Sequence, residues 1–439
     1  MAEQGFSGVF EGMIPEEELT ALCAEHEPVA RRSRKRETRQ LVGDLVFHQL
    51  HQSGTLAEHG ARLGGERISD SAYAQRRALL PQELFDSLLA AGLAPLADPQ
   101  RHPDGFYRGW RLIGVDGTEA SVTNTPANTR LRRAASRRGQ AAFAKLKLVT
   151  AMELGLHNPL AAESGELGDY EVKLALRLWS RLPEHSLVII DRLYGAARHV
   201  AQMQTAGQGR DLALLVRVRG SIKARVLENL GDGSRLVEVR PTRRKGEPAA
   251  QPITVREIRA RVRMPGGREV SVRLWTTLVD ATAYPALELA QLYVVRWEHE
   301  LSYRELKLDV RDGDVLESHT PETALQELAA IVLALAVTAR LRAAATEPLS
   351  VPARRISLRK LLLATASIWE AFALAGRTLT VRQKSHMLHA YFARLQREAI
   401  LPKRRPRHCP RAIRQPVSGW PRLQRRSDST GPASVTIVI

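Results

Sequence analysis

The N-terminal part of the chain has a hydrophobic pattern typical of helices. Apolar residues recur every three or four positions in LVGDLVFHQL (41–50) and in PQELFDSLLAAGLAPL (81–96). The pattern ends near residue 100. We therefore expect a helical N-terminal domain at residues 1–100.

Beyond residue 105, short apolar runs alternate with a helical pattern. RLIGVDG (111–117), KLKLVTAMEL (145–154) and HSLVIIDRLYG (185–195) have the composition of buried strands, and the first and third end in an Asp and a Gly-containing turn. YEVKLALRLWSRL (170–182) has a helical period. Alternating strands and helices predict an α/β sheet in a domain at residues 105–345.

A β-rich segment at about 208–282 interrupts this alternation. LALLVRVR (212–219) predicts one strand, and ITVREIRARVRM (253–264) and EVSVRLWTTLV (269–279) predict two more. The last two are separated by a Pro-Gly-Gly turn signal, so we expect a hairpin. Apolar residues and arginines alternate along its first strand, which predicts one apolar and one cationic face.

The rest of the chain is expected to be helical until a basic tail. A long helix is predicted from Pro285 to Leu308, because Pro suits the first turn of a helix. The apolar run Leu328–Ala339 is shorter than the roughly 18 to 20 residues that span a bilayer. We interpret it as a buried helix and expect no membrane partner. We expect residues 346–402 to form a helical C-terminal segment, and the Arg- and Pro-rich residues 403–439 predict a disordered tail.

The composition of the chain indicates an anionic partner. The 439 residues include 65 Lys and Arg against 47 Asp and Glu, a net charge of +18. Such an excess favours a polyanion as partner. Two cysteines, Cys23 and Cys409, give neither a disulfide framework nor a zinc-site spacing, so a cytoplasmic location is expected.

Three acidic residues stand out by context. Asp116 and Asp191 follow apolar strands, and Glu300 lies on the predicted helix. A carboxylate at the end of a buried strand is costly unless it is paired or binds a cation, so these residues are candidate ligands of a divalent metal. The alternative is that each Asp forms a turn or caps a helix, and that Glu300 is a surface acid.

The predicted helix places four polar residues on one side. At about 100° per residue, Tyr293, Arg296, Glu300 and Lys307 fall within an arc of about 60°. A stripe with an aromatic hydroxyl, an acid and two bases is poor material for a hydrophobic core. A solvated ladder of salt bridges is the alternative interpretation.

The spacing of these four residues, Y-x2-R-x3-E-x6-K, resembles the YREK signature of DDE transposases of the insertion-sequence-4 family. Asp116 in GVDGT and Asp191 in IIDRLYG resemble the first two acids of that family's triad. Residues 5–23 also resemble its N-terminal domain. The resemblance implies a ribonuclease-H-like mixed sheet flanked by helices, with a β-rich insertion before the last catalytic acid and a helical DNA-binding N-terminal domain.

The resemblance also implies an activity. Asp116, Asp191 and Glu300 are then the catalytic metal ligands, holding two Mg²⁺ ions for which Mn²⁺ can substitute. Cut-and-paste transposition is expected on double-stranded DNA, at the ends of the insertion sequence and at the target, by a homodimer associated with the nucleoid. The alternatives are a ribonuclease-H-like nuclease without strand transfer and an inactive, element-derived DNA-binding protein.

The remaining candidates are DNA contacts. The resemblance assigns Tyr293, Arg296 and Lys307 to phosphates near the cleaved bond. Family members stack an extruded base on aromatic side chains, for which Trp275 and Trp297 are the candidates, with a place in the core as the alternative for Trp275. A cationic stretch after Asp116 is expected to contact the DNA backbone. Its candidate residues are Arg132, Arg133, Arg137 and Arg138.

Overall fold

A computed structural model of the chain describes residues 5–27, 36–51, 53–63, 67–136, 139–242, 251–263, 269–305, 315–375, 378–402, 412–414, 421–423 and 434–437. The chain forms two compact units. The first comprises residues 1–186 and 297–400, and the second comprises residues 187–296 and 401–439. The predicted domain boundaries remain a prediction.

The first unit begins with a layer of helices, as predicted. These are α1 (Gly5–Glu11), α2 (Glu16–Glu25), α3 (Thr38–His48), α4 (Leu56–Arg62), α5 (Asp70–Arg77) and α6 (Gln82–Gly92). Their ends follow local rules of capping. The Thr55 and Ser69 side chains, for example, accept the orphan backbone N–H groups at the starts of α4 and α5.

The sheet of the first unit is mixed. Its strands are β1 (Phe106–Tyr107), β2 (Trp110–Val122), β3 (Arg133–Ser136), β4 (Gly139–Glu153), β5 (Asn158–Glu166) and β12 (Val315–Leu316). β4 pairs antiparallel with β2, β3 and β5, whereas β12 runs parallel to β2. Helices α7 (Glu171–Leu178) and α10 (Trp297–Glu305) lie against β2.

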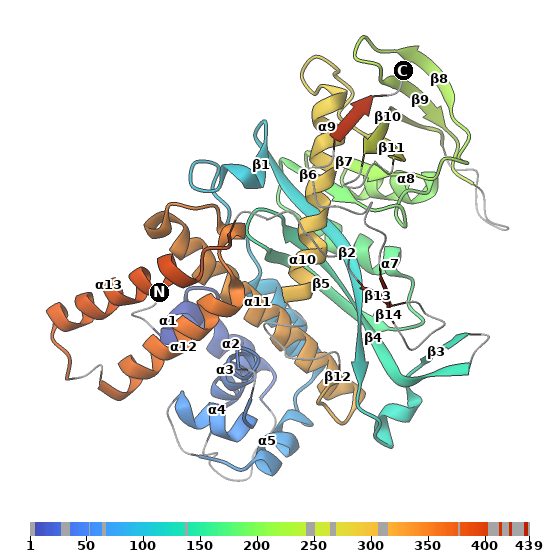
Figure 1. Cartoon of the computed structure of the whole chain (residues 1–439). Helices are drawn as coiled ribbons and strands as arrows, with labels where there is room; N and C mark the ends of the chain where they lie inside the picture. The colour runs from blue at the N-terminus through green and yellow to red at the C-terminus, as the bar shows by residue number, and fades with distance from the viewer. Residues whose placement is uncertain are drawn as a thin grey trace. The chain divides into compact units, whose positions relative to one another are not determined.

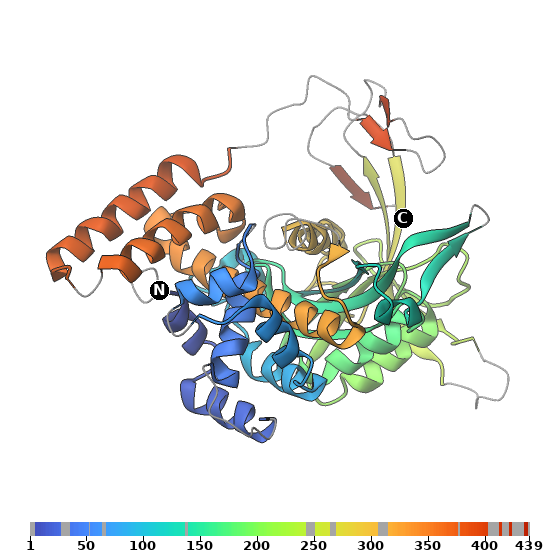
Figure 2. The same cartoon turned by 90° about the horizontal axis from the view of Figure 1, so that it is seen from below.

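The core of this unit is built around α11 (Pro321–Leu349). Figure 1 shows α11 running beside the N-terminal helices, and it contacts α3, α6 and β5. It is long and apolar enough to cross a membrane, but 83% of its most apolar window is buried inside the protein. The predicted buried helix is therefore confirmed. Figure 2 shows α12 (Leu358–Ala375) and α13 (Val381–Glu398) side by side, and both contact α11.

The second unit is mainly β-structure. Its strands follow the order β6-β7-β11-β10-β9-β8, with α8 (Ala197–Ala206) and α9 (Ala286–Leu292) as its helices. The strands are β6 (Ser186–Ile190, whose first residue belongs to the other unit), β7 (Leu212–Arg217), β8 (Arg225–Asn229), β9 (Arg235–Val239), β10 (Ile253–Arg263) and β11 (Glu269–Thr276).

The predicted hairpin is confirmed. β10 and β11 pair antiparallel from Arg256↔Thr276 to Arg263↔Glu269. Ile258 and Ala260 are buried, whereas the alternating Arg259 and Arg261 are exposed, so one face is apolar and the other cationic. The α/β class, a mixed sheet flanked by helices with a β-rich insertion before Glu300, is likewise confirmed.

The tail contains three short strands where disorder was expected. β13 (Ala412–Arg414) pairs with β14 (Pro421–Leu423). β15 (Ser434–Ile437) pairs antiparallel with Ala260–Arg263 of β10 and also contacts α9. The rest of the tail beyond residue 402 lies outside the described residues.

Candidate active site

Asp116 lies inside a long strand rather than at its end. β2 continues to Val122, and Asp116 pairs with Thr150 of β4. The prediction that the strand ends at Asp116 is wrong. The reason is that residues 117–121 keep pairing with β4, and buried Ala120 and Val122 keep the alternation of a half-buried strand.

Two glycines, on either side of Asp116 in β2, allow neighbouring helices to approach the strand closely. A Cβ atom at Gly114 would lie 2.5 Å from Nδ1 of His299 on α10. A Cβ atom at Gly117 would lie 2.4 Å from the carboxyl carbon of Glu171 on α7. Since side chains alternate along a strand, Gly114 and Asp116 face the same side, which is the side covered by α10.

A buried hydrogen-bond network fixes α10 on this face. The Tyr303 hydroxyl donates to the backbone oxygen of Asp116 at 2.5 Å and lies 3.0 Å from the Thr150 hydroxyl. Nε2 of His299 lies 3.0 Å from the same Thr150 hydroxyl. Burial raises the pKa of Tyr303 well above its usual value, and the Asp116 charge adds to this, so its phenol remains a donor.

Charged groups hold the other side of α10. His157 lies between two acids of this helix, with Nδ1 2.7 Å from Glu305 and Nε2 3.2 Å from Glu298. Arg342 of α11 donates to Glu305 at 2.7 Å. Burial alone would raise the pKa of Glu305, but Arg342 and His157 outweigh it and lower the pKa to about 2. Glu300, half-buried on the same helix, therefore has a fixed backbone.

Asp191 belongs to the second unit. It follows β6, whose five residues are all buried. Its Oδ1 accepts the backbone N–H of Leu193 at 2.6 Å and so forms a turn. Gly195 is required nearby, because a Cβ atom there would lie 2.1 Å from the Arg217 carbonyl oxygen.

The predicted continuous helix from Pro285 to Leu308 is wrong. α9 ends at Leu292, residues Tyr293–Arg296 form a 3₁₀ turn, and α10 begins at Trp297. In a 3₁₀ turn, residues three apart are eclipsed, so the side chains of Tyr293 and Arg296 are brought together rather than offset by about 60°.

Tyr293 and Arg296 are hydrogen-bonded through their side chains. Burial raises the pKa of Tyr293 to about 12, against the opposing charges of Arg296 and Arg217 and with a contribution from Asp191. Within the second unit, Tyr293 therefore lies in the field of Asp191.

Other candidates are placed differently or not described. Trp275 is wrong as a stacking residue, because it is 0% exposed and its indole N–H donates to Glu257 at 3.2 Å. Trp275 therefore lies in the core, as the alternative interpretation had it. Lys307, Arg137 and Arg138 and the side chain of Trp297 lie outside the described residues.

Two arginines of the cationic stretch are described. Arg132 is exposed and lies beside Gly168, where a Cβ atom would be 3.2 Å from its guanidinium. Arg133 donates to the Ala142 carbonyl of β4 and to Asn124 in the loop after β2, each at 3.0 Å, so its guanidinium is bound within the first unit. Their role in DNA binding stays a prediction.

Sequence reasoning missed the residues that position α10. Thr150, His157 and Arg342 are far from Glu300 in sequence, and no pattern around them points to an active site. Tyr303 offered a signal, because it lies three residues after Glu300 on one helix and thus on the neighbouring position of its surface.

The donor chemistry suits a divalent cation. Asp116, Glu300 and Asp191 are half-buried and supply the hard oxygen atoms that such ions bind. In the part of the chain that the structure describes, no three His, Cys, Asp or Glu side chains are grouped so as to hold a metal. Two of the acids belong to the first unit and Asp191 to the second.

Comparison with known proteins gives three similarities. Residues 110–337 match the family described as Transposase DDE domain. Over 328 residues the chain is 28% identical to transposase InsG for insertion sequence element IS4 of Escherichia coli strain K12, which covers 72% of each chain. A cryo-EM structure of a piggyBac transposase synaptic complex with hairpin DNA is 10% identical, with a TM-score of 0.46 over 91% of this chain and 86% of that one.

Proposed function

Because the chain belongs to the DDE transposases, and within them to the insertion-sequence-4 family, we propose that it moves its own insertion sequence by cut-and-paste transposition. Transposases bind DNA, DDE transposases have a ribonuclease-H-like catalytic domain, and the family uses divalent metal ions. The finer proposal is hydrolysis at the terminal inverted repeats followed by strand transfer into target DNA.

The observation that carries the proposal is the docking of α10 on β2. Tyr303 binds the backbone of Asp116 from the same helix that carries Glu300. The helix that carries Glu300 is thereby held against the face of β2 that carries Asp116. Family resemblance adds Asp191 as the third acid, at the start of a turn in the second unit.

These three carboxylates are the proposed ligands of two Mg²⁺ ions, with Mn²⁺ as a substitute. When bound, such ions activate an attacking hydroxyl and stabilise the departing oxygen in an in-line displacement. The side chains themselves bind and orient. Tyr293, with a pKa of about 12, is a neutral donor for a phosphate oxygen. Arg296 supplies a permanent charge beside it.

The two steps have the same balance of bonds. In cleavage, a water oxygen forms a bond to phosphorus, the bond from phosphorus to the 3′-oxygen breaks, and a proton ends on that 3′-oxygen. In strand transfer, the 3′-hydroxyl replaces water and forms a bond to a phosphorus of the target, the bond from that phosphorus to the target's own 3′-oxygen breaks, and a proton ends on the released oxygen. One P–O bond forms for each that breaks, so no external energy source is required.

The test is cleavage of element-end DNA by the purified full chain with Mg²⁺. Glu300→Gln keeps the shape of the side chain and removes its charge, and we expect a loss of at least about 10³-fold in rate. Glu398→Gln, an exposed acid of α13, is the matched control and should cleave normally. Equal cleavage by Glu300→Gln and the original protein would contradict the proposal.

A joining assay separates the alternatives. Joined product in target DNA supports the transposase. Cleavage without any joined product favours a nuclease, and DNA binding without cleavage favours an inactive DNA-binding protein. The proposal extends to a homodimer that brings two ends together, near the nucleoid in the cytoplasm. Light scattering of the complex with end DNA tests the dimer, and a fluorescent fusion tests the location.

A further inference from the structure

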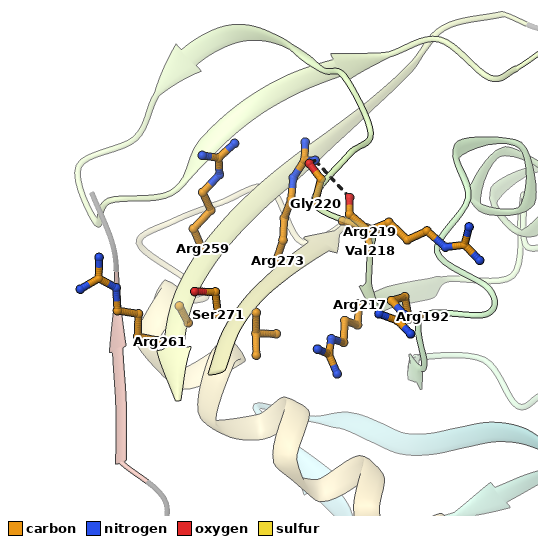
Figure 3. Close-up of a pocket in the computed structure, with 11 residues that line it drawn as sticks. Arg192, Arg217, Val218, Arg219, Gly220, Arg259, Arg261, Ser271 and Arg273 are labelled. Carbon is orange, nitrogen blue, oxygen red and sulfur yellow. Dashed lines mark hydrogen bonds between the residues drawn. The ribbon is translucent and has the colours of Figure 1, made fainter. Parts of the chain in front are cut away.

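The second unit contains a pocket whose lining is rich in arginine (Figure 3). Its volume is about 600 Å³. Its lining arginines come from four separate segments and are Arg192, Arg217, Arg219, Arg259, Arg261 and Arg273. Among the described residues that line it, none is acidic.

The register of the β10–β11 hairpin produces one wall of this pocket. Arg259 pairs with Arg273, and two residues further Arg261 pairs with Ser271. Positions two apart on a strand share a face, so Arg259 and Arg261 point to the same side of the hairpin. Arg259 and Arg261 are exposed on it.

Part of the positive charge around the pocket is neutralised by Glu257. Arg273 is buried and donates to Glu257 and to the carbonyl oxygens of Gly220 and Ile222. Glu257 also accepts from Arg259 at 3.0 Å and from Arg235 at 2.9 Å, so three arginines share one carboxylate.

The excess of positive charge therefore remains on the arginines that Glu257 does not bind. Within the described residues, neither Arg219 nor Arg261 forms an ion pair. Both side chains are exposed, so their charges are available to a ligand. An anion that carries several charges along its length can neutralise both walls at once.

The size of the pocket narrows the choice of anion. A volume of about 600 Å³ is that of a ligand site and exceeds a single phosphate. A double helix, whose major groove alone is about 12 Å wide, is too large to enter it. The lining has no aromatic ring on which a base could stack, so the sugar–phosphate backbone is the part that fits.

We propose that this pocket binds the backbone of a single DNA strand, without preference for its sequence. The inference rests on the proposed function, because it takes DNA as the ligand. Arg192, at one edge of the pocket, directly follows Asp191 in the chain. The bound strand therefore leaves the pocket beside one of the proposed catalytic acids.

The test measures binding of a labelled 20-nucleotide single strand of arbitrary sequence to the full chain at several salt concentrations. Arg219→Gln/Arg261→Gln removes the two charges of the pocket that form no ion pair within the described residues. Arg382→Gln/Arg397→Gln removes two exposed charges from α13 and is the matched control. For single strands, each lost phosphate contact lowers the salt slope by about 0.7, so we expect a decrease of about 1.4 and a loss of at least about tenfold in affinity.

The single variant Arg261→Gln guards against misfolding, since it leaves the bonds of Glu257 intact. It should lower the slope by about 0.7 with an unchanged unfolding temperature. Slopes equal to that of the α13 control overturn the proposal. An equal loss for a 20-base-pair duplex overturns its single-strand part. Tighter, pocket-dependent binding of oligoglutamate would assign the pocket to an acidic protein segment instead.

The outcomes separate this inference from the proposed function. If the original protein cleaves element ends but the pocket variants bind single strands normally, the pocket inference fails and the transposase proposal stands. If the pocket variants lose the slope but the original protein neither cleaves nor joins DNA, the transposase proposal fails and the pocket remains a DNA site.

Discussion

The hydroxyl of Tyr303 lies 2.5 Å from the backbone oxygen of Asp116, and it also contacts Thr150. Because the phenol is fully buried and neutral, it ties α10 to β2 without adding charge next to the proposed metal ligands. Tyr303 is thus a positioning residue for both acids.

Tyr303→Phe should slow cleavage and raise the Mg²⁺ concentration needed for half-maximal rate, because the two acids lose their common support. Loss of a buried hydrogen bond also costs about 1–3 kcal/mol of stability. Tyr391→Phe is a matched control, since Tyr391 of α13 is buried and its hydroxyl lies 2.9 Å from that of Thr365 on α12. It should lower stability alone. A normal Mg²⁺ requirement in Tyr303→Phe would argue against positioning.

Arg342→Met should destabilise the first unit strongly. It leaves the half-buried Glu305 without its buried arginine partner, and breaking a buried ion pair costs about 3–5 kcal/mol. The surface pair of Arg394 and Glu398 is the comparison, and Arg394→Gln should cost less than about 1 kcal/mol. Urea unfolding of both variants measures the difference, and equal values would contradict this ranking.

Acid should weaken the N-terminal helices. Burial lowers the pKa of His48 and of His51 from 6.5 to about 4 in the folded protein. Between pH 4 and 6.5 the unfolded state binds more protons, so stability falls as the pH decreases through this window. Melting temperatures from pH 8 to 5 should show this slope, and His48→Asn/His51→Asn should flatten it. An unchanged slope in that variant would exclude these two residues as its source.

Gly117→Ala should destabilise the protein through Glu171. The new methyl group would overlap the Glu171 carboxylate, and overpacking costs about 1–3 kcal/mol. Glu171→Ala in the same chain should restore much of this loss, which a double-mutant cycle measures as coupling. Gly231→Ala has nothing within 4 Å and is the control. Additive effects of the two substitutions would show that the contact does not matter.

Local patterns were sufficient for several elements. The turn signal between two strand-like runs predicted the hairpin, the apolar run 187–190 predicted the strand before Asp191, and the apolar run of α11 predicted a buried helix. Each of these depends on residues close in sequence, whose period reports burial directly.

Other features depend on partners that no period reports. A 3₁₀ turn replaces helix at Tyr293–Arg296 with no proline or glycine to mark it. Trp275 is held inside by Glu257, a residue on the facing strand. The contact between Tyr303 and Asp116 joins positions almost half the chain apart, so only the folded sheet brings them together.

Strand β15 has a practical consequence for handling the protein. Its backbone covers part of β10, two residues from the C-terminal Ile439. An uncovered strand edge offers unpaired amide and carbonyl groups to other molecules and promotes aggregation. Loss of β15, by mutation or by proteolysis, should therefore increase aggregation of the purified protein.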